Sequence, residues 1–148
     1  MEELRKITDG KRVYLPLLLL ADPSEEMVNR YLPQGDFYVL FSDGIPVCEA
    51  VVIRLNAEEC ELKNLATDEN HQKQGYAARM IHYLCEQYQG KFQRMLVGTS
   101  EENIVFYKNN GFRFSHVVKN FFTDYYPEPI YENGKQLCDM TYFVKPLN

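Results

Sequence analysis

A short glycine-containing segment, residues 72–77, has the residue types that a phosphate-binding turn needs. It reads Gln-Lys-Gln-Gly-Tyr-Ala and comes directly before a helix that the apolar spacing predicts. Gly75 has no side chain, so an anion can approach the unpaired N–H groups of the first helical turn. Lys73 can add a positive charge, and Gln72 and Gln74 can add amide donors. The segment therefore predicts a site for a pyrophosphate, although it matches neither of the commoner glycine-rich phosphate loops.

A second chemical pair, Asn103 and Tyr107, precedes the Gly111-Phe112 dipeptide. The two residues are one helical turn apart, so their amide and phenol groups project from the same face and can address one ligand. Aromatic residues at helical intervals usually pack in a core, however. The spacing alone leaves both roles open for Tyr107.

A third segment, residues 121–134, is too aromatic for an ordinary exposed loop. Its carboxylates lie beside tyrosines, a combination that can hold an ammonium group by charge and by cation–π contact. The candidate residues for binding a cationic substrate are Asp124, Tyr126, Glu128 and Glu132. Packing over the core, or a subunit contact in a homodimer, would explain the same composition, and we leave this alternative open.

The phosphate-binding segment lies within a predicted strand, turn and helix that together span residues 60–90. Cys60 and Leu62 share one face at the period of a strand, but the next large apolar residue is Leu65, so the pattern slips by one residue near Lys63. A β-bulge produces such a slip. The helix that follows has one apolar face and a glycine just past its end, formed by Ala77, Met80, Ile81, Leu84, Cys85 and Tyr88, then Gly90.

The rest of the chain alternates short strands and short helices. We expect a strand over 3–7, a helix holding the leucines of 15–20, a helix capped by Asp22 or Ser24 that ends at Tyr31, a hairpin of 37–41 with 46–55, and strands over 94–98, 112–122 and 137–144. Thr99 and Glu102 have the spacing of a capping box for the helix that ends at Asn110-Gly111.

The pattern Gln-x-x-Gly-x-Ala, after a bulged strand and before an amphipathic helix, resembles the signature of the GNAT superfamily of acetyl-CoA-dependent N-acetyltransferases. The Asn103, Tyr107 and Gly111-Phe112 series is similar to the family as well. The resemblance covers most of the chain and is weakest before Asp36. Gln72 stands where the family more often has Arg, and Ala77 where it more often has Gly.

This resemblance implies a fold and a set of site residues. The fold would be α+β, a mixed and mostly antiparallel sheet of about seven strands with helices on both faces, in one domain over residues 1–148. The co-substrate would be acetyl-CoA, with its pantetheine arm against backbone exposed where the bulged strand separates from the strand over 94–98. Tyr107 would be the general acid, and the cofactor-binding residues would be Leu65, Ala66, Thr67, Gln72, Lys73, Gln74, Gly75, Tyr76, Ala77 and Asn103.

Acetyl transfer to an amine requires a base, an oxyanion partner and a proton donor. An alkylammonium of pKa about 10 must lose its proton, and Glu61 is the candidate base. An exposed strand carboxylate paired with Lys63 is the alternative role for Glu61. A backbone N–H at the bulge would hold the oxyanion. Tyr107, with a pKa of about 10 against about 8.5 for a thiol, can protonate the leaving sulfur. We expect direct attack in a ternary complex, because neither Cys60 nor Cys85 has a recognisable histidine partner.

Composition narrows the class of protein. A chain of 148 residues with 45% hydrophobic composition has room for one globular domain. A net charge of −5 without a basic tract disfavours nucleic acid and membrane surfaces as partners, and mildly favours a cationic substrate. The four cysteines lack C-x-x-C spacing, so we expect buried free thiols, no metal and a cytoplasmic location.

Two alternatives to an acetyltransferase remain at this point. One is a non-catalytic CoA-binding sensor or interaction module, which would have no use for Tyr107. The other is an α/β domain with a chance motif. The acceptor amine, on a small molecule or a peptide, is not identified by any of these residues.

Overall fold

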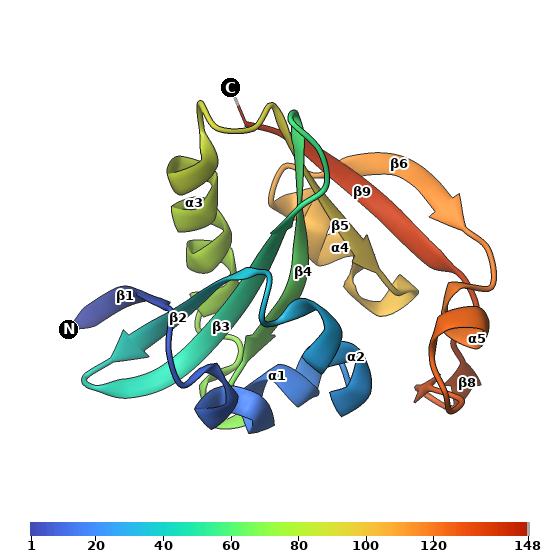
Figure 1. The fold of residues 1–148 in the computed structure, drawn as a ribbon, viewed down its shortest axis with the longest axis horizontal. Helices are drawn as coiled ribbons and strands as arrows, with labels where there is room; N and C mark the ends of the chain where they lie inside the picture. Colours follow the sequence, from blue (N-terminus) through green and yellow to red (C-terminus); the bar gives the residue numbers. More distant parts are fainter. Residues whose placement is uncertain (148) are drawn as a thin grey trace.

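The computed structural model describes residues 1–147, and its centre is a seven-stranded sheet (Figure 1). The strand order is β1-β2-β3-β4-β5-β9-β6, and every neighbouring pair is antiparallel except β4 with β5. The mixed, mostly antiparallel sheet is therefore confirmed. The strands are β1 (Glu2–Ile7), β2 (Asp36–Ser42), β3 (Ile45–Arg54), β4 (Glu59–Thr67), β5 (Arg94–Thr99), β6 (Arg113–Val118) and β9 (Met140–Pro146).

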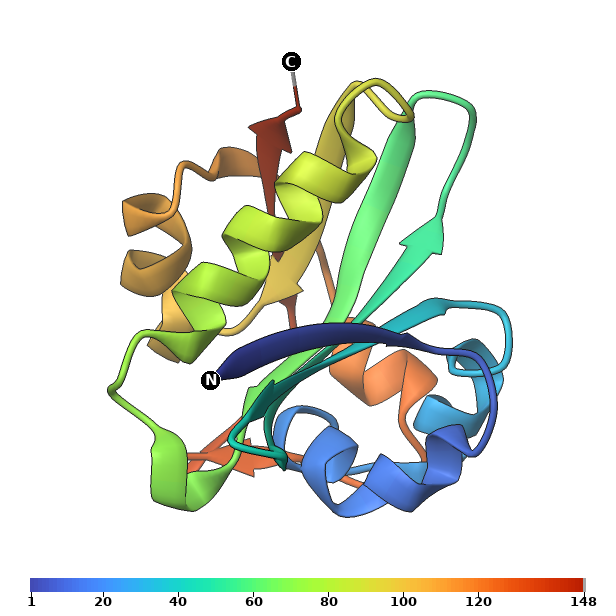
Figure 2. The same cartoon turned by 90° about the vertical axis from the view of Figure 1, so that its left-hand side faces the viewer.

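Helices cover both faces of this sheet. The α-helices are α1 (Leu15–Ala21), α2 (Glu25–Tyr31), α3 (Tyr76–Tyr88), α4 (Ile104–Asn109) and α5 (Phe121–Tyr125), and the 3-10 turns are η1 (Lys11–Tyr14), η2 (Glu69–His71) and η3 (Glu101–Asn103). One core cluster joins the sheet to α3 and α4 through Leu84 and Tyr107, and a second joins it to α1 and α2 through Leu18 and Val28. Figure 2 shows α3 in front of β4 and β5.

The expected bulge in β4 is present. Val51 of β3 pairs with Asn64, but the next residue, Val52, pairs with Leu62, so Lys63 is the extra residue. A bulge bends its strand and increases the local twist. The parallel pairing of β4 with β5 ends one residue before the bulge, at Leu62 and Val97. The last part of β4 therefore has no neighbour on its β5 side.

Local signals for the ends of elements are confirmed at several places. The Ser24 hydroxyl accepts a hydrogen bond from the Met27 N–H at 3.2 Å and caps α2. Asp43 and Gly44 join β2 to β3 with φ of 50° and 80°, the combination that a tight hairpin turn requires. Gly90 follows the end of α3 with φ of 85°, as predicted for a terminating glycine.

The prediction of a capping box at Thr99 is wrong. Thr99 is the last residue of β5, and its hydroxyl donates to the Ser100 carbonyl at 3.1 Å. Ser100 occupies the cap position of η3 without a side-chain hydrogen bond to the turn. Glu102 faces a cavity instead of capping a helix. The pairing of Thr99 with Thr141 of β9 and the position of Glu102 in a cavity wall are tertiary features that sequence spacing does not reveal.

The C-terminal part departs from the expected strands. The strand predicted over 112–122 ends at Val118, because Phe121 belongs to α5 and packs its ring on Phe122, Tyr125 and Tyr126 at centroid distances of 5.3, 5.2 and 6.2 Å. The final strand begins at Met140 rather than residue 137, after a hairpin of β7 (Tyr131–Glu132) and β8 (Lys135–Gln136). Aromatic packing outweighs the strand-like alternation here.

The cysteines differ in their environments. All four have free thiols, but only Cys48 and Cys60 are buried. Cys138 is exposed, because it lies in the connection before β9 rather than in a strand, so the expectation of a buried thiol is wrong there. Within residues 1–147, no helix has the length and apolar content needed to span a membrane.

Candidate active site

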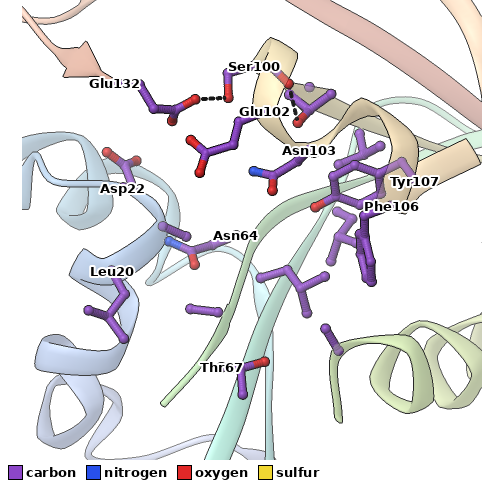
Figure 3. Close-up of a pocket in the computed structure, with 18 of the residues that line it drawn as sticks. Leu20, Asp22, Asn64, Thr67, Ser100, Glu102, Asn103, Phe106, Tyr107 and Glu132 are labelled. Carbon is purple, nitrogen blue, oxygen red and sulfur yellow. Dashed lines mark hydrogen bonds between the residues drawn. The ribbon is translucent and has the colours of Figure 1, made fainter. Parts of the chain in front are cut away.

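A cavity of about 820 Å³ opens where β4 and β5 separate (Figure 3). Its walls come from the end of α1, the second half of β4, the start of α3, the end of β5, η3 with α4, and the β7–β8 region. Thirteen residues named from the sequence line it: Glu61, Leu65, Ala66, Thr67, Gln72, Lys73, Gly75, Tyr76, Ala77, Asn103, Tyr107, Tyr126 and Glu132. Segments far apart in the chain therefore share one site.

The floor of the cavity is the unpaired part of β4. Residues 65–67 pair with β3 on one side and have no β5 partner on the other. Backbone N–H and C=O groups left in this state must find another hydrogen-bonding partner. An extended, amide-bearing molecule can supply that partner by lying along the strand.

The start of α3 leaves N–H groups without helical partners at one end of the cavity. The first intrahelical bond joins the Arg79 N–H to the Gly75 carbonyl at 3.0 Å, so the N–H groups of the turn between them have no partner within the helix. Gly75 has φ of 84°, and a Cβ placed there would lie 3.2 Å from an Arg79 guanidinium nitrogen. Lys73 lines the same turn. These features fit a pyrophosphate.

Gln74 is the one residue of this segment that lies outside the cavity lining. Its carbonyl accepts a hydrogen bond from Arg79 at 3.3 Å, and Arg79 also pairs with Glu2 at 3.1 Å. Gln74 thus helps to hold Arg79 beside the turn, rather than facing the space where a ligand would bind.

Tyr107 presents a free hydroxyl to the cavity. Its ring is 8% exposed and packs against Phe106 and Phe112 at centroid distances of 5.1 and 5.6 Å. No residue among 1–147 forms a hydrogen bond with its hydroxyl, which points into the cavity in Figure 3. Burial, and to a lesser extent the nearby Glu49 carboxylate, raises the pKa of Tyr107. The phenol therefore stays protonated at neutral pH, and its hydroxyl is open to a molecule that enters the cavity.

Glu61 is a buried carboxylate on the cavity wall. Glu61 is 6% exposed, so the alternative prediction of an exposed carboxylate is wrong. The predicted pairing with Lys63 is present, with the lysine nitrogen 3.9 Å from a Glu61 oxygen. Burial raises the pKa of Glu61, and the positive charge of Lys63 opposes that shift. A carboxylate whose pKa is moved towards neutrality suits proton abstraction.

The acidic aromatic segment divides into two groups. Tyr126 and Glu132 line the cavity, whereas Asp124 and Glu128 are exposed and lie outside its lining. Asp124 and Glu128 are therefore not part of the candidate site. The Ser100 hydroxyl donates to Glu132 at 2.5 Å.

The polar wall residues that were missed from the sequence include Asp22, Asn64 and Glu102. Asp22 had a local explanation as a helix cap, Glu102 as part of a capping box, and Asn64 as a residue beside the bulge. Glu102 meets Glu132 from a distant segment, and their shared hydrogen bond and like charge raise the pKa of Glu102. Only the imperfect alternation of β4 pointed towards Asn64. Across residues 1–147, no group of three metal-binding side chains is close enough to hold an ion.

Comparison with known proteins gives one consistent result. Residues 33–114, more than half of the chain, match a family model described as an acetyltransferase (GNAT) domain. The chain is 31% identical over 128 residues to the uncharacterized N-acetyltransferase YvbK of Bacillus subtilis, with coverage of 84% of this chain and 83% of that protein.

Solved structures agree with this result. A GNAT family acetyltransferase from Elizabethkingia anophelis with acetyl-CoA bound has a TM-score of 0.92 and 32% identity, covering 98% of this chain and 97% of its own. An acetyltransferase of Bacillus subtilis in complex with CoA has a TM-score of 0.89 and 27% identity, covering 99% of both chains. The chain belongs to the GNAT superfamily of acetyltransferases, enzymes that use acetyl-CoA as co-substrate.

Proposed function

We propose that this acetyltransferase moves the acetyl group of acetyl-CoA directly to a primary amine of a small molecule or peptide, in a ternary complex. The observation that carries the proposal is that one cavity contains the anion-binding turn at Gly75, the unpaired backbone of β4, the free hydroxyl of Tyr107 and the carboxylate of Glu61. A co-substrate and an acceptor that enter this cavity together would meet between these groups.

The binding of acetyl-CoA is assigned to two parts of the cavity. The N–H groups at the start of α3, with Lys73, would hold the pyrophosphate. The open backbone of residues 65–67 would pair with the amides of the pantetheine arm. Asn103, on the wall beside Tyr107, would orient the end of that arm.

The chemical step would give the two titratable groups opposite roles: Glu61 would accept a proton and Tyr107 would donate one. Glu61 would accept the proton that the acceptor's ammonium must lose before its nitrogen can attack. Backbone N–H groups next to the bulge would stabilise the negative charge that develops on the carbonyl oxygen. Tyr107 would donate its proton to the leaving sulfur. As the C–N bond forms and the C–S bond breaks, the attacking nitrogen would lose a second proton, which would restore the Tyr107 phenol, and CoA would leave as the thiol. Glu61 would then release the first proton to solvent, so that charge and protons balance.

Direct transfer is favoured over an acetylated cysteine. None of the four cysteines, all of which the structure describes, lines the cavity. Burial raises the pKa of Cys48 and of Cys60 to about 12 each, so both thiols are protonated at neutral pH and are weak nucleophiles.

Initial-velocity kinetics test the proposal. Acetyl-CoA and a panel of small amines and peptides are varied together, and the release of free CoA is measured. We expect intersecting double-reciprocal lines for the acceptors that react, and no acetylated enzyme by mass spectrometry. Parallel lines with an acetylated cysteine would overturn direct transfer. A rise in Tm with acetyl-CoA and no CoA release for any amine would favour a binding module instead.

A further inference from the structure

Asp22 is a buried carboxylate on the cavity wall with no positive partner. It ends α1 and is 7% exposed. One oxygen accepts the Tyr31 hydroxyl at 2.8 Å and the other accepts the Ser24 N–H at 3.3 Å. No lysine, arginine or histidine in residues 1–147 forms an ion pair with it. A buried negative charge without a counter-charge is costly, so a cation from outside the protein would complete the site.

Asn64 supplies a second, independent acceptor at this end of the cavity. It is 3% exposed, and its amide nitrogen donates to the Leu18 carbonyl at 3.1 Å and to the Tyr31 hydroxyl at 3.0 Å. Because Tyr31 gives its own proton to Asp22, it must accept from Asn64, which determines the orientation of the amide. The Asn64 oxygen is then left without a hydrogen-bond partner. An ammonium, with three N–H donors, can satisfy both acceptors.

The position of Asp22 shows which nitrogen it would bind. In Figure 3, Asp22 lies on the α1 side of the cavity and the Tyr107 hydroxyl on the α4 side, with Asn64 between them. The attacking nitrogen must lie near the leaving sulfur, and therefore near Tyr107. It must also be neutral, whereas an unpaired carboxylate favours a nitrogen that keeps its charge. The cation at Asp22 is thus a different group of the same acceptor.

Two further carboxylates add negative charge on this side. In Figure 3 the Glu102 carboxylate points towards the Asp22 side of the cavity, whereas Glu132 accepts a hydrogen bond from Ser100, and neither glutamate forms an ion pair with a basic side chain in the described part of the chain. Lys135 pairs with Glu101 at 3.8 Å, and of the two lysines in the cavity lining, Lys63 and Lys73, Lys63 pairs with Glu61 at 3.9 Å. A cation that enters the cavity would therefore meet an excess of negative charge.

We propose that Asp22 binds a second, non-reacting ammonium of the acceptor, so that the acceptor class is amines with two positively charged nitrogens. This inference rests on the proposed function. Tyr31 and Asn64 are positioning residues: Tyr31 orients the Asp22 carboxylate, and Asn64 orients Tyr31 and adds the second acceptor.

The test compares α,ω-diaminoalkanes with n-alkylamines of the same chain length, using free CoA release with saturating acetyl-CoA. We expect the wild-type enzyme to prefer the diamine by about tenfold or more in kcat/KM, chiefly through KM, the scale of a hydrogen-bonded charge contact. Equal kcat/KM for both series would overturn the inference, and this comparison needs no variant.

Asp22→Asn removes the charge and keeps one of the two acceptor oxygens. The diamine's KM should rise about tenfold or more, so that the preference is lost, while the KM of acetyl-CoA stays at the wild-type value. Tyr31→Phe should reduce the preference in the same direction by a smaller factor. Glu101→Gln, outside the cavity lining, removes one charge nearby and should leave the preference unchanged. Equal losses for monoamine and diamine with Asp22→Asn would assign Asp22 a purely structural role.

A binding measurement separates this inference from the proposed function. The binding of the diamine is measured by calorimetry with CoA in place of acetyl-CoA, so that no acetyl group can be transferred. The diamine should bind to the wild-type protein and more weakly to Asp22→Asn. If no amine releases CoA but this dependence on Asp22 is seen, the proposed function fails and the inference stands. If monoamines and diamines release CoA equally well, the proposed function stands and the inference fails.

Discussion

Leu62 and Val97 form the last pair of the parallel ladder between β4 and β5, and the extra residue of the bulge, Lys63, follows immediately. Parallel strands that stayed paired would leave no space at the centre of the sheet. The bulge lets β4 continue for several residues without β5, which opens the cavity and exposes backbone for a ligand. A single local irregularity thus opens the cavity of the candidate site and brings Asn64 to its wall.

Gly75→Asp should abolish acetyl-CoA binding. The new side chain would fill the turn at the start of α3, adopt an unfavourable φ of 84° and place a carboxylate against the pyrophosphate. Calorimetry with acetyl-CoA measures the effect. Gly44→Asp, at φ of 80° in the β2–β3 turn with open space around it, imposes the same backbone strain away from the cavity and should bind normally. Wild-type affinity in a folded Gly75→Asp protein would remove the turn from the binding site.

Tyr107→Phe should lower kcat by about 10²-fold, the usual scale for a positioned proton donor. The ring contacts with Phe106 and Phe112 are kept, and the hydroxyl makes no hydrogen bond among residues 1–147, so Tm and acetyl-CoA affinity should stay close to wild type. Tyr83→Phe is the matched control, because its hydroxyl bonds to Glu2 at 3.1 Å outside the cavity. Near-normal turnover in Tyr107→Phe would show that solvent, and not Tyr107, protonates the leaving sulfur.

Glu61→Gln should remove the acidic limb of the pH profile. Glu61 acts as a base only when it is deprotonated, and burial raises its pKa, so wild-type kcat/KM should rise with pH above the usual carboxylate value of 4.5. The variant should lose about 10²-fold in kcat/KM and this rise together. The same acceptor amine is used for both proteins, so the titration of the amine itself affects both pH profiles equally.

Glu59→Gln is the control for that experiment. Glu59 lies two residues earlier on β4, outside the cavity lining, and hydrogen bonds from Asn56 and Arg94 lower its pKa. Its profile should match wild type. An unchanged acidic limb in Glu61→Gln would assign the general base to another group.

Glu49 should make the protein less stable as the pH rises. The side chain is fully buried on β3, and burial raises its pKa well above 4.5, although a hydrogen bond from the Ala66 N–H opposes that shift. The folded protein accommodates Glu49 in its protonated form, so the contribution of Glu49 to the free energy of unfolding is fully present below the pKa that Glu49 has in the unfolded chain. This contribution is lost as the pH rises towards the pKa of Glu49 in the folded protein, at up to about 1.4 kcal/mol per pH unit.

Urea unfolding between pH 5 and 8 checks this linkage. The free energy of unfolding of Glu49→Gln should fall less steeply with pH than that of wild type, so the variant gains relative stability at higher pH. The exposed Glu128→Gln should follow the wild-type slope. Parallel curves for wild type and Glu49→Gln would show that Glu49 does not titrate with unfolding.

Features that depend on near neighbours in the chain could be predicted from the residues alone. The slip in the alternation at Lys63 indicated the bulge, Ser24 and Gly90 marked helix ends, and Gly75 marked the start of α3. Each depends on backbone conformations and hydrogen bonds within a few residues, which local residue types control.

The acceptor side of the cavity could not be predicted in this way. Asp22, Asn64 and Glu102 lie at the end of α1, on β4 and on η3, and they line one cavity only because the sheet order places these segments around one opening. Thr99 and Glu102 matched a capping box, but Thr99 pairs with Thr141 as the last residue of β5, and Glu102 meets Glu132 instead. The charge and the burial at such a site depend on side chains from segments that lie far apart in the chain. The spacing of residues within one segment contains no information about which distant side chains will lie close to it.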